Sequence, residues 1–339
     1  MTQKELANRM GRPLKTINEI VKGKAAITAE TALQLERVLG VPASFWINLE
    51  KNYREALARK RDEERLSGQL AWLKQFPVGA MVRAGWIQGK EKVGQLREAL
   101  RFFGVASPDQ WHALWAEPGV SYRKSRVFTS DPGAVTAWLR RGEVEAQGVQ
   151  CRPYDSSRLR STLEQMRALT TKPPEVFQPT SVRLCAESGV ALVFVRELPK
   201  LRISGATRWL SPTKAMIQLS LRHKTDDHLW FSFFHEVGHI LLHGKRAVFI
   251  DHDGAPRDAR EAEADTFAAD ILIPRSDFAQ IRAMSSLGEA DVRRFAQQIG
   301  VSPGIVVGRL QHEGLLPYNR LNALKQQLEW AMPKARTAA

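Results

Sequence analysis

The sequence predicts an α+β protein in which an all-helical N-terminal domain precedes a domain built on a small sheet. Three observations lead to this prediction. The first 65 residues have short helical spacing, three runs between Val190 and Leu221 have the Val, Ile and Trp content of strands, and helical spacing returns after Thr225. At 339 residues the chain exceeds the size at which one core keeps growing, so we expect separately cored domains.

Short helices are expected throughout the N-terminal domain, residues 1–65. Thr2 and Glu5 form a capping box that starts the first helix. The predicted helices cover Gln3–Met10, Leu14–Lys22, Ile27–Val38 and Pro42–Leu57, with glycine-containing turns between them. Helical spacing places one apolar set against a common core: Leu6, Met10, Ile17 and Val21. The mixed charges from Lys60 to Arg65 predict a solvated helix that ends the domain.

Three further regions follow the N-terminal domain. Residues 66–178 have mainly helical spacing and are expected to form a scaffold, residues 179–285 carry strands and helices, and residues 286–339 form a helical subdomain. The predicted strands cover Val190–Val195, Ile203–Leu210 and Lys214–Leu221. The predicted helices cover Thr225–Leu242, Ala259–Leu272 and Glu289–Gln298.

The composition narrows the class of protein. The sequence has neither an uncharged apolar run of membrane-spanning length nor a secretory signal, so we expect a cytoplasmic protein that does not bind membranes. Cys151 and Cys185 are too few for a disulfide framework or a thiolate zinc cage, so a metal would need histidine and carboxylate ligands. The net charge of +14 favours a polyanionic partner, although a basic soluble surface explains it equally well.

The segment His235-Glu236-Val237-Gly238-His239 lies in the middle of an apolar predicted helix. On a helix, His235 and His239 lie on one face, so both imidazoles can reach one zinc ion. Glu236 is offset toward the metal's water and fits the general base of a peptidase. Burying these three side chains without a metal or partners is costly, so a metal site is favoured over a purely structural helix.

A third metal ligand must come from another segment. Leu242 and Lys245 stand where the longer HExxHxxGxxH motif has its glycine and last histidine. In the downstream helix Glu261 and Asp265 share a face, which suits Glu261 as the ligand and Asp265 as the hydrogen-bond partner of a zinc histidine. Glu263 points away from that face and is the weaker candidate. The alternative for the whole segment is a solvated acidic stripe.

Two other histidines lie close to the motif in the sequence. His243 follows His239 by one helical turn. We expect it to support the zinc ligands rather than bind the metal, because a catalytic zinc keeps one position open for water. His252 stands between Asp251 and Asp253 and is expected to lie in a solvated loop.

A resemblance to the ImmA/IrrE family of metallopeptidases is carried by His235 to His243, then Glu261 to Ala268, then Leu272-Ile273-Pro274. With Gly189 to Pro199, Gly205 and the run Ala215 to Leu219, it covers about residues 180–280. The resemblance implies a zincin-like fold, a zinc cofactor and cleavage of a transcriptional repressor or antitoxin partner, which relieves repression after stress or during mobile-element induction. In zincins an edge strand pairs with the substrate backbone, and residues 215–221 are expected to be that strand.

The N-terminal domain has a resemblance of its own. Thr2 to Gly11 and Lys15 to Lys24 resemble the helix-turn-helix of the XRE family, and Ile27 to Leu33 with Phe45 to Leu49 are closest to HigA-type antitoxins. The second helix of such a motif lies in the major groove of DNA.

That placement makes Lys15, Thr16 and Asn18 candidates for base or phosphate contacts, and Lys22 and Lys24 candidates for phosphate neutralisation. The family has a helix before the one that starts at Thr2, and this sequence begins without it. Recognition of another repressor is therefore the alternative to DNA binding.

The C-terminal segment Asp291 to Leu310 repeats a helix-glycine-turn-helix rhythm and resembles the end of antitoxin-fused ImmA/IrrE proteins. A packing subdomain is favoured over a second DNA reader. Two functions remain for the whole chain. One is a zinc endopeptidase that cuts a DNA-bound repressor or antitoxin, and the other is a non-proteolytic, DNA-binding regulator of antitoxin type whose zinc domain senses or binds a partner. The intact Glu236 favours the endopeptidase.

Overall fold

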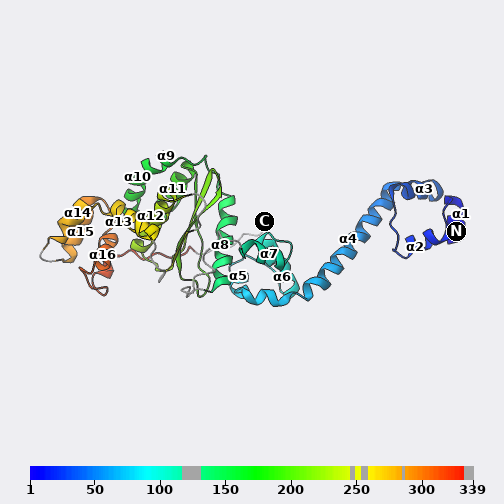
Figure 1. The fold of residues 1–339 in the computed structure, drawn as a ribbon, viewed down its shortest axis with the longest axis horizontal. Coiled ribbons are helices and arrows are strands. Elements are labelled where there is room, and N and C mark those ends of the chain that lie inside the picture. Colours follow the sequence, from blue (N-terminus) through cyan, green and yellow to red (C-terminus); the bar gives the residue numbers. More distant parts are fainter. Residues whose placement is uncertain (117–130, 245–248, 253–258, 285–286, 332–339) are drawn as a thin grey trace. The chain divides into compact units, whose positions relative to one another are not determined.

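A computed structural model describes residues 1–116, 131–244, 249–252, 259–284 and 287–331 (Figure 1). The chain forms two compact units. Unit 1 comprises residues 1–71 and 91–97, and unit 2 comprises residues 72–90 and 98–339. The observed α+β architecture, with an all-helical N-terminal region and a small mixed sheet in unit 2, confirms the predicted fold class.

Unit 1 begins with the three short helices α1 (Gln3–Met10), α2 (Leu14–Val21) and α3 (Ala29–Leu39). The capping box of Thr2 and Glu5 is formed, with Thr2 N donating to Glu5 Oε2 at 2.8 Å. The small core of these helices is made by Ala7, Met10, Ile17 and Leu35, with Leu6, Ile27, Val38, Leu39 and Trp46 packed against it. Val21, which we expected in this core, is 61% exposed, because α2 ends there and its last turn passes the edge of the core.

Helix α4 (Ala43–Ser67) follows in unit 1 and joins the predicted helix Pro42–Leu57 to the charged helix predicted at Lys60–Arg65. The helix at Lys60–Arg65 is confirmed, and the expected end at Leu57 is wrong because the helix continues without a break. Ion pairs at helical spacing join Arg54 to Glu50, Arg59 to Glu55 and Arg65 to Asp62. Such pairs each add a few tenths of a kcal/mol to a helix, roughly 0.2–0.5 kcal/mol, and can extend it beyond its apolar positions.

The described residues between α4 and the sheet are mainly helical, as predicted. Its elements are η1 (Leu70–Gln75), α5 (Val78–Arg83), α6 (Lys92–Phe103), α7 (Pro108–Ala116), α8 (Pro132–Gln147), α9 (Ser156–Ser161), α10 (Leu163–Ala168), η3 (Leu169–Thr171) and α11 (Pro174–Glu187). Aromatic rings pack edge to face within unit 2, with Trp72 centred 4.8 Å from Phe76 and 5.7 Å from Trp111. This packing accounts for the tryptophan content of the region.

The sheet has four strands in the order β1-β3-β2-β4: β1 (Val190–Phe194), β2 (Ile203–Ser211), β3 (Lys214–Leu219) and β4 (Phe249–His252). β3 runs parallel to β1 and antiparallel to β2, so it lies inside the sheet. The expectation that residues 215–221 form an edge strand is therefore wrong.

Strand β4 was not predicted. His252 pairs in register with Ile203 of β2, so the expected loop at this position is wrong. The run Phe249-Ile250-Asp251-His252 is short and carries two polar residues, and only its antiparallel pairing with β2 makes it a strand. Tertiary pairing of this kind overrides local propensity.

Helices cover both faces of the sheet (Figure 1). On one face, Gln218 of β3 donates from Nε2 to the carbonyl oxygen of Trp138 in α8 at 2.8 Å. On the other face, Ile217 joins a core that includes Phe233 and Val237 of α12 (Asp226–Leu242). The sheet thus supports the helix that carries the His-Glu-His segment.

Helix α13 (Ala259–Leu272) follows β4. After it the described residues form α14 (Arg275–Arg282), α15 (Glu289–Ile299), α16 (Pro303–His312) and η4 (Asn322–Leu324). Helix α16 is buried along Ile305, Val306, Val307 and Leu310 and packs against α12. A helix buried in this way cannot enter a DNA groove, which supports a packing subdomain. No helix in the described ranges combines the length and apolar character needed to cross a membrane.

Candidate metal centre

Helix α12 starts after Thr225 with Asp226 and Asp227 in its first turn, where carboxylates interact favourably with the helix dipole. Its next three turns are apolar on nearly every side, as expected for a helix enclosed by sheet and helices. His235, Glu236 and His239 lie in this enclosed part and are 3%, 0% and 2% exposed. Polar side chains buried this deeply need partners.

Helix α13 packs directly against α12. Gly238 makes the approach close, since a Cβ atom at this position would lie 3.2 Å from Cα of Ala264 and 3.2 Å from a ring carbon of Phe267. The close packing brings Glu261 and Asp265, one turn apart on α13, to the histidines of α12.

Three ligand atoms converge between the two helices. Nε2 of His235 lies 2.9 Å from Nε2 of His239, and Oε2 of Glu261 lies 3.2 Å and 3.6 Å from these two nitrogens. A tetrahedral zinc site with bonds of about 2.0–2.1 Å has ligand atoms about 3.3 Å apart. The three observed separations bracket this value, so the three side chains fit a zinc ion with small adjustments, and among the described residues they are the one His/Cys/Asp/Glu group close enough to hold a metal.

The charge states of these ligands also suit a cation. Burial raises the pKa of Glu261, but the hydrogen bonds and charges of His235 and His239 outweigh it and hold this pKa well below its usual range. Burial lowers the pKa of His239, against the opposing hydrogen bond from Glu261. An ionised carboxylate next to a neutral imidazole is the protonation state that binds a metal.

A second layer of contacts orients the histidines. Oδ1 of Asp265 lies 3.0 Å from Nδ1 of His235, on the opposite side of the ring from Nε2. Nδ1 of His243 lies 3.0 Å from Nδ1 of His239, and Nε2 of His243 lies 3.1 Å from Oε2 of Glu263. Glu263 thus lies outside the converging atoms, and the sequence did not indicate its contact with His243.

Glu236 is enclosed between α12 and β2. A Cβ atom on Gly205 would lie 2.6 Å from Oε1 of Glu236, and the hydroxyl of Thr207 donates to the Glu236 carbonyl at 3.2 Å. From the sequence, Gly205 was expected only to carry the family resemblance, and its close approach to Glu236 was not predicted. A glycine inside a strand often marks a close approach by another group, and this signal was available in the sequence.

Residues 192–311 match the peptidase M78 family, described as IrrE N-terminal-like domain. Residues 1–46 match the helix-turn-helix family. The chain joins an IrrE N-terminal-like domain to a helix-turn-helix domain. Curated proteins gave no match.

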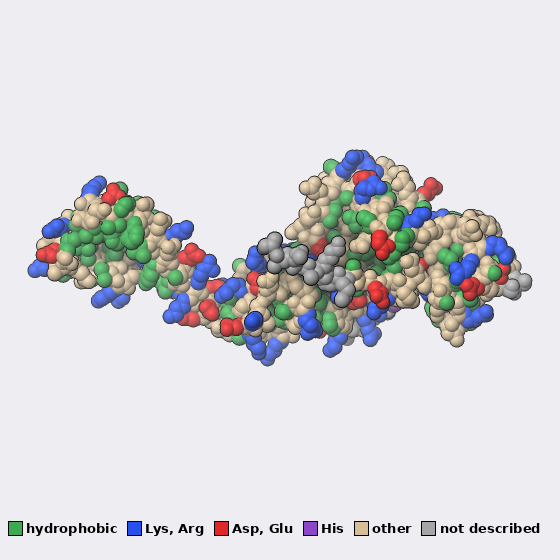
Figure 2. Space-filling view, turned by 180° about the vertical axis from the view of Figure 1, so that it is seen from behind, with side chains coloured by type: hydrophobic (Ala, Val, Ile, Leu, Met, Phe, Trp, Pro, Cys, Tyr) green, Lys and Arg blue, Asp and Glu red, His purple; other side chains and the backbone are tan. Residues whose placement is uncertain are grey.

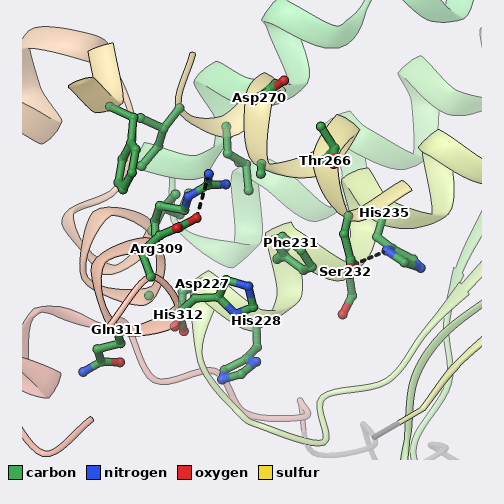
Figure 3. A pocket seen from close by; sticks show the side chains of 18 of the residues that line it. Asp227, His228, Phe231, Ser232, His235, Thr266, Asp270, Arg309, Gln311 and His312 are labelled. Carbon is green, nitrogen blue, oxygen red and sulfur yellow. Dashed lines mark hydrogen bonds and ion pairs between the residues drawn. The ribbon is translucent and has the colours of Figure 1, made fainter. Parts of the chain in front are cut away.

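The IrrE N-terminal-like domain and the segment that follows it line a cavity of about 810 Å³ next to the converging ligands (Figure 3). His235, Glu261 and Asp265 line one end, and Phe231, Ser232 and Thr266 continue its wall along α12 and α13. Residues of α16 and the segment after it line the other end. Ligand pockets usually fall between about 300 and 1,000 Å³, so the cavity has room for far more than a metal ion.

The helix-turn-helix domain presents the five candidate DNA contacts on or just after α2. Lys15, Lys22 and Lys24 are exposed, and Thr16 and Asn18 are half-buried. Lys15 lies 4.0 Å from Glu19 across one helical turn. Large apolar side chains are also exposed on this unit, among them Val21 and Phe45. Figure 2 shows apolar side chains gathered on one face of this unit, with Lys and Arg side chains around them.

Proposed function

We propose that the protein is a zinc-dependent endopeptidase that cleaves a transcriptional repressor or antitoxin, and so relieves repression in the cytoplasm. The convergence of His235, His239 and Glu261 beside the enclosed Glu236 is the observation that supports this proposal most strongly. Two histidines and one glutamate are the ligand set of several zinc peptidases, and they leave a coordination position open. A closed structural site would have four protein ligands.

His235, His239 and Glu261 would hold the zinc ion. When bound, zinc supplies Lewis-acid activation of water and of the peptide carbonyl group. Glu236 accepts a proton from the attacking water and delivers it to the leaving amine, the role of a general base and then a general acid. Asp265 accepts a hydrogen bond from His235 Nδ1, which leaves Nε2 of that ring unprotonated and directed at the metal. His243 supports His239 in the same way.

The helix-turn-helix domain supports a substrate found at DNA. Residues 1–46 contain seven Lys and Arg residues but only four Glu residues, and Lys22 and Lys24 are exposed just after α2. Phosphate neutralisation by such residues would hold the peptidase close to an operator. A repressor bound at that operator would then be the nearest substrate. Its cleavage would relieve repression after stress or during mobile-element induction.

Substitution of Glu236 by Gln tests the peptidase directly. Gln keeps the shape of the side chain and cannot accept the proton, so cleavage should fall at least about 100-fold while bound zinc is unchanged. Candidate repressors from neighbouring genes are co-expressed with each variant, their fragments are identified by mass spectrometry, and zinc is measured in the purified protein. Glu289→Gln, at an exposed ion pair on α15, is the matched control.

Cleavage or derepression that persists unchanged in zinc-bound Glu236→Gln would contradict the endopeptidase. That result would support the alternative, a DNA-binding regulator of antitoxin type that does not cut its partner.

A further inference from the structure

One continuous piece of chain contributes to the cavity wall away from the metal ligands. It begins with Gln311 and His312 at the end of α16 (Figure 3). Glu313, Tyr318 and Lys325, which follow along the chain, also line the cavity. These residues share the cavity with His235 and Glu261. The segment 313–325 is named the wall segment below.

A hydrogen-bond network centred on the buried side chain of Gln311, called the hub, holds the backbone of the wall segment. Gln311 is 2% exposed, and its Nε2 donates to the carbonyl oxygen of Arg320 and to Oδ1 of Asn322, each at 3.0 Å. Asn322 in turn donates from Nδ2 to the carbonyl oxygen of Tyr318 at 2.7 Å. Lys325 donates to Oε1 of Gln311 at 2.8 Å. Hydrogen bonds thus hold the wall segment at Tyr318, Arg320, Asn322 and Lys325.

Two residues in this part of unit 2 have left-handed backbone. Leu321 of the wall segment has φ 60°, and Lys224, next to the cavity residue His223, has φ 54°. The chain just after the wall segment contacts Lys224, because the amide of Leu328 donates to the Lys224 carbonyl at 2.8 Å. Left-handed backbone at a residue with a Cβ is costly and persists only where its surroundings enforce it, often at binding sites.

Tyr318 is a highly exposed residue on this hydrogen-bonded backbone. It lines the cavity and is 71% exposed, the highest exposure among the large apolar and aromatic side chains of the described residues. An aromatic ring on a rigid support loses little conformational entropy when it binds a partner. Tyr is among the residues that most often contribute the binding energy of protein interfaces.

We infer that the wall segment is the substrate-docking surface of the proposed peptidase, with the Tyr318 ring contacting an apolar side chain of the extended substrate several residues from the scissile bond. The inference rests on the proposed function, since it requires a polypeptide that reaches from the metal ligands to Tyr318. The hub formed by Gln311 presents the ring, and the chemistry occurs at the other end of the cavity.

A peptide library made from a digested bacterial lysate tests this docking surface without knowledge of the natural substrate. Zinc-loaded full-length protein cuts the library, and the new termini are sequenced by mass spectrometry. Wild type should enrich Leu, Met or Phe at one fixed distance from the cut. In Tyr318→Ala that enrichment should disappear, while preferences next to the cut remain. Tyr318→Phe should keep it, because the contact is made by the ring.

Kinetics on the best-cut peptide provide a second readout. Tyr318→Ala should raise KM about 10-fold and change kcat less than about 2-fold, because lost docking weakens binding without touching the chemical step. Leu114→Ala, at a 55% exposed side chain on α7, is the control and should leave both parameters unchanged. Tyr318 is exposed, so the variants are expected to fold.

The outcomes separate the two proposals. An unchanged profile and KM in Tyr318→Ala would overturn the docking surface alone. A wild-type protein that binds zinc and cuts nothing in the library, or that cuts equally well as Glu236→Gln, would overturn the peptidase and the docking surface with it.

Discussion

Gly205 and Glu236 occupy adjoining space, so that a Cβ atom on the glycine would lie 2.6 Å from Oε1 and 2.9 Å from Cγ of the glutamate. The atoms that would be displaced belong to a side chain and not to the backbone of α12. The side chain can therefore move while the helix stays in place. The position of the proposed general base depends on the missing Cβ of β2.

Gly205→Ala should therefore lower peptidase activity without releasing zinc. The displaced carboxylate loses its alignment, and misplacement by about 1 Å can cost roughly 100-fold in rate. The measurement is the cleavage rate together with the zinc content of the purified variant. Gly94→Ala, where an added Cβ meets nothing within 4 Å, is the control and should keep full activity. Wild-type activity in Gly205→Ala would contradict the placement of Glu236.

Asp265→Asn should weaken zinc binding roughly 10- to 100-fold. The amide keeps the size of the side chain, but it no longer provides the carboxylate 3.0 Å from His235 Nδ1 that favours the metal-binding form of the ring. Zinc affinity is measured by competition with a chelator. Asp270→Asn on the same helix removes an exposed ion pair with Arg275 and should leave the affinity unchanged. Equal affinities for the two variants would show that Asp265 does not orient the ligand.

Zinc affinity should depend on pH in a defined direction. Burial lowers the pKa of His239, so this ring stays neutral in the folded protein at pH values where an ordinary histidine, with a pKa of about 6.5, begins to charge. The pKa of Glu261 is also lowered, which keeps this ligand ionised. Proton competition at His239 and Glu261 therefore begins at a lower pH than it would at ordinary side chains of these types.

A titration of chelator-competed zinc affinity between about pH 8 and pH 5 checks this expectation. The affinity should be nearly constant at the alkaline end and fall on the acid side. As pH decreases, the unfolded chain binds a proton at His239 before the folded chain does. The free energy of unfolding of the metal-free protein therefore also decreases as pH decreases. A loss of affinity already complete at neutral pH would contradict the depressed pKa.

Lys325→Met should destabilise unit 2 by about 3–5 kcal/mol. Lys325 Nζ lies 2.7 Å from Oδ2 of Asp227, and the two side chains are 10% and 7% exposed, so the substitution leaves a buried carboxylate without its cation. Chemical unfolding followed by tryptophan fluorescence measures the change. Arg293→Met breaks the exposed pair with Glu289 and should cost less than about 1 kcal/mol. Similar losses for both variants would show that burial does not matter here.

Lys22→Gln with Lys24→Gln should reduce the salt dependence of DNA binding. Each neutralised phosphate contributes about 0.9 to the slope of log affinity against log salt, so the double variant should lose about 2. Mobility-shift titration at several salt concentrations gives this slope. Lys172→Gln, at an exposed lysine of unit 2, is the control. An unchanged slope in the double variant would remove these lysines from the DNA interface.

Much of the fold was accessible from the sequence because local signals and tertiary packing agree. The helix at Gln3–Met10 was placed by its capping box, and the helix at Ala259–Leu272 by its flanking residues and spacing. The three apolar strands were found because β-branched runs are enclosed by helices on both faces. Elements on which local sequence signals and tertiary packing agree can be predicted from the sequence.

The misses at β3, β4 and Gly205 have a different cause, which is contact between segments far apart in the sequence. β4 is a strand only through its partner β2, and β3 has no free edge only because β1 returns beside it. Val21 has the spacing of a core residue but lies beyond a core too small to cover it. The contact of Glu236 with Gly205 joins a helix to a strand about thirty residues away, a distance that no helical or strand period encodes.

The first turn of α12 is held by chain that comes about one hundred residues later. Asp226 accepts hydrogen bonds from Ser302 and from the amide of Gln326, Thr225 forms a bridge with Gln327, and Lys325 pairs with Asp227. A recombinant fragment that stops at residue 285 would lose all of these contacts, and with them the support for the start of the ligand-bearing helix. A fragment made to crystallise the proposed metal centre should therefore extend past Leu328, even though the residues proposed to bind zinc and activate water all lie between His235 and Glu261.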